Sequence, residues 1–233
     1  AASDVYKRQI LVIAEHDNNE LKVATLNTVA AASEIGGDIE ILIAGSECED
    51  VANQAAQIPG IQKILLADKP AYGNFLPENI GSLVAEIGSS YTHILTPATA
   101  NGKNFLPRVA ASLDVAQVSD ISAVVSPDTF ERPIYAGNCI ATVQSTDSVK
   151  VISVRTTGFD ACEASGGSSP IEVIDMDKDL AISSFMKEEI AVSDRPELTA
   201  ADVVISGGRG MQNGDNFSLL NGIADKLGAA IGA

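Results

Sequence analysis

The residues best suited to chemistry lie near the end of the sequence, at positions 206–210, where they read Ser-Gly-Gly-Arg-Gly. The β-branched run at 203–205 directly before them predicts a short buried strand. Because glycine has no Cβ, a glycine-rich turn after such a strand lets backbone N–H groups approach a ligand closely. The Arg209 guanidinium adds a planar, forked cation that suits a phosphate or an anionic ring. The pattern predicts an anion-binding loop.

The helix after this loop is predicted at residues 216–227, where apolar side chains recur at helical spacing, and Asp215 is predicted to cap it. A bound anion would then depend more on Arg209 and the loop N–H groups than on the helix dipole. No Gly-Lys-Ser/Thr follows, so the loop is not a Walker loop. Counting from Gly208, the third glycine of a dinucleotide fingerprint would fall on Asn213. An ordinary strand-to-helix turn with a surface arginine is the alternative.

Two other polar runs follow predicted strands earlier in the chain. Residues 15–17 (Glu-His-Asp) come after a strand at 10–14, at the sheet edge where open α/β proteins often bind ligands. His16 could act there as acid or base, but no nucleophile is nearby in the sequence, which favours a polar loop. Residues 101–104 (Asn-Gly-Lys-Asn) could hold a phosphate through N–H groups and Lys103, or simply form a capped helix start.

The remaining polar residues predict neither catalytic nor metal-ligating groups. Arg132 and Tyr135 are interpreted as core or interface residues. The two histidines, His16 and His93, are too few and too far apart to predict a zinc site. We also find no Ser-His-Asp grouping and no pair of carboxylates suited to acid–base work.

Composition limits the class of protein. The chain has 233 residues, of which 45% are hydrophobic, so it can bury a sizeable core. The 31 acidic residues outnumber 15 Lys and Arg, and the net charge of −16 argues against nucleic acid as a partner. No apolar run approaches about 18 residues, so we expect no membrane insertion. Three cysteines outside any C-x-x-C motif predict reduced thiols and a cytoplasmic, bacterial location.

Up to about residue 113, predicted strands and helices alternate. This order is typical of a doubly wound, mostly parallel α/β sheet with right-handed crossovers. Asn18 or Asn19 is predicted to cap the first helix, and Pro107 is predicted to lie in the first turn of the fourth helix or to kink it. The predicted strands are 10–14, 39–44, 64–67 and 92–96, and the predicted helices are 20–35, 50–57, 77–87 and 101–113.

The pattern then changes to strands without helices, which predicts an antiparallel extension at the edge of the sheet. In this part, strands 139–144 and 149–155 are predicted to pair through a turn at 145–148, and residues 176–179 are interpreted as a solvated charge run. The other predicted strands are 118–125, 132–135, 171–174 and 190–192.

Four segments are predicted along the chain. Residues 1–9 are interpreted as a foreign or disordered leader, since they resemble neither a signal nor a transit peptide. Residues 10–193 form an N-terminal α/β domain, and the polar, proline-containing residues 194–200 form a linker. A new strand–loop–helix unit then begins, so residues 201–233 are the start of a second α/β domain.

Four runs of the sequence are distinctive: residues 10–16 (Ile-Leu-Val-Ile-Ala-Glu-His), 102–110 (Gly-Lys-Asn-Phe-Leu-Pro-Arg-Val-Ala), 132–138 with 140–143, and 204–211 (Val-Ile-Ser-Gly-Gly-Arg-Gly-Met). In this order they resemble one family, the alpha subunit of electron transfer flavoprotein. The last run is the most specific, and together the runs extend the resemblance from residue 10 to the end.

The resemblance implies a redox carrier rather than an enzyme with substrate turnover. It implies a heterodimer with a beta subunit, contacted by the first domain, and one FAD held mainly by the second domain. Such proteins serve fatty acid β-oxidation: they accept electrons from acyl-CoA and other dehydrogenases and pass them to a quinone oxidoreductase. By this resemblance Arg209 contacts FAD, and Ser206, Gly207, Gly208 and Gly210 form the loop around it.

The family continues beyond the point where this sequence ends, so we expect an incomplete FAD domain that binds FAD weakly or not at all by itself. Apolar surface at 203–205 and on the Phe217/Leu220 face of the helix should then be partly uncovered. The alternative function is a nucleotide-binding (ATP or AMP) α/β domain without a redox role, which would use residues 101–104.

Overall fold

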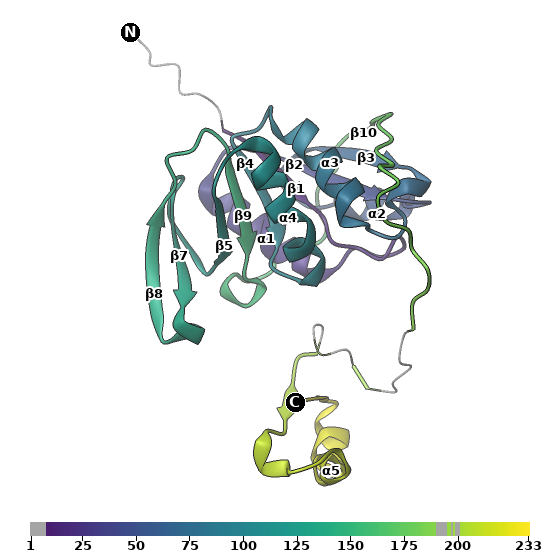
Figure 1. The fold of residues 1–233 in the computed structure, drawn as a ribbon, viewed down its shortest axis with the longest axis vertical. Coiled ribbons are helices and arrows are strands. Elements are labelled where there is room, and N and C mark those ends of the chain that lie inside the picture. The colour runs from purple at the N-terminus through teal and green to yellow at the C-terminus, as the bar shows by residue number, and fades with distance from the viewer. Residues whose placement is uncertain (1–7, 190–194, 197, 199–200) are drawn as a thin grey trace. The chain divides into compact units, whose positions relative to one another are not determined.

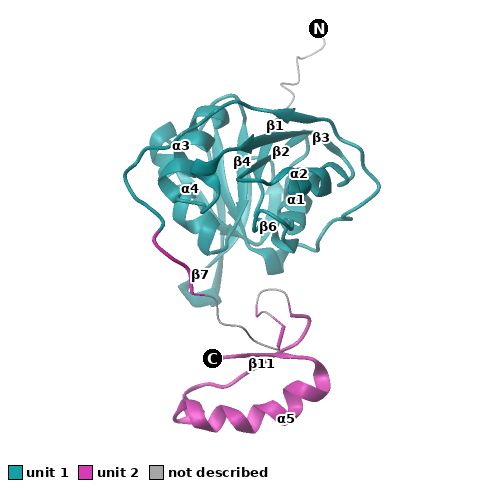
Figure 2. Ribbon diagram, turned by 90° about the vertical axis from the view of Figure 1, so that its right-hand side faces the viewer, with its two compact units in different colours: residues 1–185 teal, residues 186–233 magenta. Residues whose placement is uncertain are grey.

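The structure, a computed structural model, describes residues 8–189, 195–196, 198 and 201–233 (Figure 1). It divides into two compact units, Ala1–Phe185 and Met186–Ala233, which are described separately here (Figure 2). The predicted strand at 190–192, most of the predicted leader and parts of the predicted linker lie outside the described residues. The predicted domain boundary after residue 193 therefore stays a prediction.

A seven-stranded parallel sheet forms the centre of the first unit, in the order β10-β3-β2-β1-β4-β9-β5. Its central strands are continuous apolar runs because both faces are covered; Ile10, Leu11 and Val12 of β1 are all fully buried. The predicted doubly wound α/β fold is confirmed. The strands are β1 (Gln9–Ile13), β2 (Asp38–Gly45), β3 (Ile61–Asp68), β4 (His93–Pro97), β5 (Gln117–Ile121), β9 (Lys150–Val154) and β10 (Ile171–Val173).

Helices pack on both faces of this sheet, and alternate strand residues serve the two layers (Figure 2). Ile10 and Val12 join the cluster that contains α1 and α2, whereas Leu11 and Ile13 join the cluster of α3 and α4. The strand order reverses direction between β1 and β4, so the carboxyl ends of these strands form the topological switch point. The helices are α1 (Val23–Ile35), α2 (Glu49–Ala56), α3 (Pro77–Gly88) and α4 (Ala100–Leu113).

The start of α1 differs from the prediction. The helix begins at Val23, and neither Asn18 nor Asn19 caps it. Asn18 instead lies in the left-handed region (φ 71°), where its side chain joins two neighbouring loops. It donates to the Gly73 carbonyl at 2.9 Å and accepts from the Ser46 N–H at 3.1 Å. Asn18, which was predicted to cap the helix, thus forms long-range contacts that sequence spacing does not reveal.

Pro107 was predicted to lie in the first turn of α4 or to kink that helix, and the first of these alternatives is wrong. Pro107 lies inside the helix, well past the first turn. The first turn is instead occupied by Asn101, Gly102 and Lys103, which follow the capping residue Thr99.

The antiparallel part forms a separate small sheet. The predicted strand 118–125 divides near Ser122 into β5, which joins the parallel sheet, and β6 (Ala123–Ser126), which does not. Asp120, with φ 59°, interrupts the regular pairing of β5 with β9. β6 pairs with β7 (Thr129–Ile134), and β7 pairs with β8 (Cys139–Gln144), both antiparallel.

The predicted hairpin between residues 139–144 and 149–155 is wrong. β8 pairs with β7, whereas β9 lies between β4 and β5 as a parallel strand. Burial explains the difference: Val151, Ile152 and Val154 are fully buried, as a central strand requires, while Ile140 of β8 is exposed.

The charge run at 176–179 was predicted to be solvated, but two of its backbone groups are hydrogen-bonded to a buried side chain. The hydroxyl of Tyr72, a fully buried side chain, donates to the Met176 carbonyl at 2.9 Å and accepts from the Lys178 N–H at 3.0 Å. Lys178 also forms an ion pair with Glu86 of α3. This segment, which follows the confirmed edge strand β10, is therefore tied to the first unit.

The second unit is a strand–helix–strand arrangement. β11 (Val204–Ser206) and β12 (Ala230–Gly232) pair in parallel, and α5 (Ser218–Leu227) connects them. The strand predicted as buried is not: Val203 and Val204 are 40% and 44% exposed. Uncovered apolar surface was expected here and on α5. Phe217 and Leu220 are indeed partly exposed, and Ile223 and Leu227 of the same predicted face are more exposed still, together with Leu219. No helix in the described part of the chain is long and apolar enough to cross a membrane.

Two isoleucine substitutions test the strand order. Ile152→Ala should lower the free energy of unfolding by about 2–5 kcal/mol, because it leaves a cavity in the buried cluster between the sheet and α1. The matched change Ile140→Ala, on exposed β8, should stay within about 0.5 kcal/mol. Urea denaturation of both variants measures the difference, and equal losses would contradict the central position of β9.

Candidate functional site

The glycine–arginine loop of the second unit follows β11, and its glycines have different surroundings. Gly207 is anchored, because its N–H donates to the Gly232 carbonyl at 3.0 Å. A Cβ on Gly207 would lie only 2.8 Å from Met211 and 2.9 Å from Phe217. A Cβ on Gly208 or Gly210 would meet no atom within 4 Å. Gly207 thus serves packing, whereas the other two glycines leave their backbone accessible.

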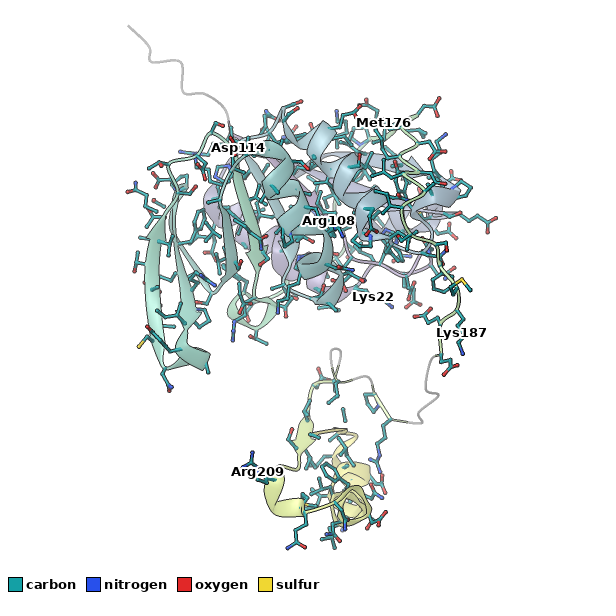
Figure 3. All side chains as sticks on the ribbon, viewed as in Figure 1. Lys22, Arg108, Asp114, Met176, Lys187 and Arg209 are labelled. Carbon is teal, nitrogen blue, oxygen red and sulfur yellow. The ribbon has the colours of Figure 1, made fainter. Side chains whose placement is uncertain are left out.

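Arg209 opens a short 3-10 turn, η4 (Arg209–Met211), and is exposed. Its side chain points away from the body of the second unit (Figure 3). It has no hydrogen bond or ion pair with another described residue, so the guanidinium is available to a ligand. Beside it lies an open hollow of about 320 Å³. The hollow is lined by Gly207, Gly208, Arg209, Met211, Gln212, Asn213, Phe217 and Ala233.

The helix entry beyond the loop is capped by an amide instead of the predicted carboxylate. The side-chain oxygen of Asn213 accepts from the Asp215 N–H at 3.1 Å and the Asn216 N–H at 3.3 Å, so Asp215 is not the cap. The Asn216 amide donates to the Met211 carbonyl at 2.7 Å and ties the helix entry to η4. Residues 214–217 form a 3-10 turn, η5 (Gly214–Phe217), before α5 begins. An anion in the hollow would therefore meet Arg209 and loop N–H groups.

Glu15 and His16 lie in the first unit, at the carboxyl end of β1. Burial lowers the pKa of His16 to about 4, more strongly than the Ala44 carbonyl raises it, so the ring is neutral at pH 7. Burial also raises the pKa of Glu15, although the hydrogen bond from the Thr99 hydroxyl opposes the shift. Within the described part of the chain no nucleophile is hydrogen-bonded to His16, so its geometry does not support acid–base catalysis.

The residues at 101–104 form a capped helix start. The Thr99 hydroxyl oxygen accepts from the Gly102 N–H at 3.3 Å and also donates to the Glu15 carboxylate. Lys103 is exposed. A carboxylate beside the helix entry opposes a phosphate there, so the geometry favours the capped-helix alternative over a phosphate site.

Two of the other polar residues considered, Arg132 and His93, have structural contacts. Arg132 of β7 donates through Nε to the Ser119 carbonyl at 2.7 Å and so joins the two sheets. His93 donates a hydrogen bond through Nε2 to the Pro127 carbonyl at 2.7 Å. Tyr135 is 76% exposed at the end of β7. The described residues contain no group of three His, Cys, Asp or Glu side chains that could hold a metal.

Comparison with known families places both parts of the chain. The family described as electron transfer flavoprotein domain matches residues 10–179. The family described as electron transfer flavoprotein FAD-binding domain matches residues 197–233, which include the glycine–arginine loop and its hollow. The chain belongs to the electron transfer flavoprotein family. This membership supports a role as an electron carrier and an association with flavin.

Relatives from distant organisms agree with this assignment. The electron transfer flavoprotein subunit alpha of Pseudomonas aeruginosa is 64% identical over 96% of this chain and 72% of its own length. The mitochondrial subunit alpha of Dictyostelium discoideum is 47% identical, over 98% of this chain and 69% of its own. The subunit alpha of Paracoccus denitrificans is 45% identical, over 96% and 72% respectively. The resemblance stated from the sequence is thus confirmed for the family.

Sequence reasoning missed three features of the second unit. Asn213 is the cap, although the Asn-Gly-Asp order before the helix was a usable signal. The Phe217 ring packs against the loop and lines the hollow, which helical spacing alone does not indicate. Arg195 forms an ion pair with Asp225 of α5 at 2.6 Å. The arginine that lines the hollow is Arg209.

The protonation of His16 predicts a pH effect on stability. The pKa of the ring is about 4 when folded and 6.5 when unconstrained. The unfolded state therefore binds more protons between these values, and stability present above pH 6.5 is lost as pH falls toward 4. Between pH 7 and 4.5, wild type should lose about 2 kcal/mol more than His16→Asn.

Chemical denaturation at both pH values measures this difference. Glu15, Asp17 and Lys22, whose charges also act near the ring, are unchanged in both proteins and so cancel. Parallel pH profiles of wild type and variant would show that His16 is not held neutral by the fold.

Proposed function

We propose that this chain is the alpha subunit of a heterodimeric electron carrier that holds one FAD. It would accept electrons from acyl-CoA and other dehydrogenases, in fatty acid β-oxidation, and deliver them to a quinone oxidoreductase, without turning over a substrate of its own. The printed name of the relatives, subunit alpha, supports a beta-type partner. The free thiols of Cys48, Cys139 and Cys162 support a reducing compartment such as the bacterial cytoplasm.

The observation that carries this proposal is the Arg209 guanidinium, which no described residue pairs and which lies beside an open hollow. The chain has a net charge of −16, so an unpaired cation in a glycine loop is a specific feature. Gly208 and Gly210 leave room for a ligand to approach their backbone N–H groups. Arg209 would bind and orient the cofactor and offset its negative charge, and the FAD would supply the reversible uptake of electrons.

The size of the hollow fits part of this cofactor. About 320 Å³ is at the small end of the range for ligand pockets, roughly 300–1,000 Å³, and FAD is a large dinucleotide. The residues present would therefore contact one portion of FAD, with further contacts coming from the partner or other parts of the carrier. For this reason we expect tight binding only in the assembled carrier.

The alternative, a redox-inactive nucleotide-binding domain, has less support. It would use residues 101–104, but Thr99 occupies the Gly102 N–H and holds the Glu15 carboxylate at the same place. Lys103 is exposed and does not line the cavity at this edge.

Removing the charge of Arg209 tests the proposal. In the carrier assembled with a beta-type subunit, Arg209→Ala should weaken FAD binding about 10- to 100-fold, the range for charge-assisted hydrogen bonds. Lys226→Ala removes another exposed cation of the same unit, on α5, and should leave the affinity unchanged. Titration with FAD, followed by flavin absorption and fluorescence, gives both affinities. An Arg209→Ala carrier with wild-type affinity and flavin potential would refute the assigned role.

The open glycines provide a second test. Gly208→Ala and Gly210→Ala should leave the fold intact, because no atom lies within 4 Å of the added methyl group. They should nevertheless weaken FAD binding several-fold, since that methyl would stand between ligand and backbone. Gly222→Ala, at an equally open position of α5, is the control, and it should stabilise the helix by about 0.5–1 kcal/mol without altering FAD affinity. Unchanged affinity in the two loop variants would place the cofactor elsewhere.

A further inference from the structure

Gln212, in the connection between β11 and α5 of the second unit, has a costly backbone conformation. It lies between η4 and η5, with φ 66° and ψ −53°. Across it, the Asn213 N–H donates to the Met211 carbonyl at 2.8 Å, so the backbone forms a γ-turn with positive φ. Turns of this kind are rare and strained. By comparison, Asp114 at the end of α4 (φ 54°, ψ 45°) lies in the allowed left-handed region.

Several hydrogen bonds hold this strained turn in place. The Gln212 N–H donates to the Arg209 carbonyl at 3.1 Å. The Met211 carbonyl, which closes the γ-turn, also accepts from the Asn216 amide at 2.7 Å. Strained backbone persists only where its surroundings fix it, and such residues cluster at ligand sites. The strain at Gln212 is therefore built into the same loop that carries Arg209.

The placement of glycine in this loop makes a glutamine at position 212 unexpected. Glycine adopts positive φ at little cost, and glycines stand at positions 207, 208, 210 and 214 around the turn. None of these four glycines has positive φ. Position 212, where glycine would relieve the strain, carries a glutamine instead. A side chain is thus present where the backbone favours glycine, which points to a role of that side chain in binding.

The Gln212 side chain lines the same hollow as Arg209. It is exposed, and its amide forms no hydrogen bond with another described residue. An amide provides donors and an acceptor without a net charge, whereas a guanidinium provides donors only. Arg209 therefore suits a negative group of a ligand, and Gln212 suits a neutral hydroxyl, carbonyl or ring nitrogen beside it. Met211 and Phe217 add apolar lining to the same hollow.

We propose that Gln212 is a second ligand-contacting residue of the hollow, whose strained turn holds its amide against a neutral polar group of the flavin nucleotide. This inference rests on the proposed function, because it takes the ligand to be FAD. Arg209 opens η4 and Gln212 directly follows it, so the two side chains contact neighbouring groups of one ligand. Because the turn is fixed before the ligand enters, binding loses less conformational freedom. The strain in the empty loop thus serves affinity.

Two substitutions at position 212 separate strain from ligand contact. Gln212→Gly removes the amide and relieves the strain, whereas Gln212→Met removes the amide but keeps an unbranched side chain and the strain. In the carrier assembled with a beta-type subunit, both variants should weaken FAD binding about 3- to 10-fold, the range for a neutral hydrogen bond. In the cofactor-free carrier, only Gln212→Gly should slow hydrogen exchange of the α5 amides several-fold, because it stabilises the folded unit.

Gly222→Ala on α5 is the matched control, because it should slow hydrogen exchange in α5 without changing FAD affinity. Wild-type affinity in Gln212→Met would overturn the amide contact, whatever the glycine variant does, and would leave the proposed function intact. A wild-type carrier that binds no FAD would refute the proposed function and this inference with it. In a structure of the FAD-loaded carrier, we expect the Gln212 amide about 2.7–3.2 Å from a polar atom of the cofactor. An amide turned to solvent there would contradict the proposal.

Discussion

The fold of the first unit depends on the burial of β1 and β4 from both sides. A strand covered by helices on each face must be largely apolar, and its buried backbone and side-chain polar groups must find hydrogen-bond partners. This requirement places α1 and α2 against one face and α3 and α4 against the other. It also forces the chain to reverse its order between these two strands, so the polar loops gather at one edge.

That edge would ordinarily be the ligand site of such a fold, but here its side chains face one another. Thr99 bonds Glu15, Asn18 bonds His16, and Phe75 covers the imidazole. The glycine–arginine loop of the second unit differs, because several of its polar groups are left open to a ligand. It leaves Arg209 without a partner among the residues that the structure describes, and it leaves two glycine backbones uncovered. Both features lower the stability of a domain, but both are required for binding an anion.

The sequence predicted those elements whose cause is local or repeats along the chain. Double-sided burial produces continuous apolar runs, so β1, β2 and β4 were found, and Gly36 marked the end of α1. Pairing between distant strands has no such signal. β8 and β9 both read as strands, and only tertiary burial assigns β9 to the sheet centre. The loop at 206–210 was likewise found from its glycines, whereas its hollow depends on how Phe217 packs.

The exposed side of α5 affects how the protein behaves in solution. Leu219, Ile223 and Leu227 recur every fourth residue, so they form a continuous exposed apolar ridge along one side of the helix. Ridges of this kind favour contact between molecules, and the uncovered Val203 and Val204 lie in the same unit. The large negative charge opposes such contacts by mutual repulsion, which salt screens. The tendency of the chain to self-associate therefore depends on two opposing forces, the attraction between apolar ridges and the repulsion between net negative charges. Self-association should increase as ionic strength rises, because salt screens the repulsion.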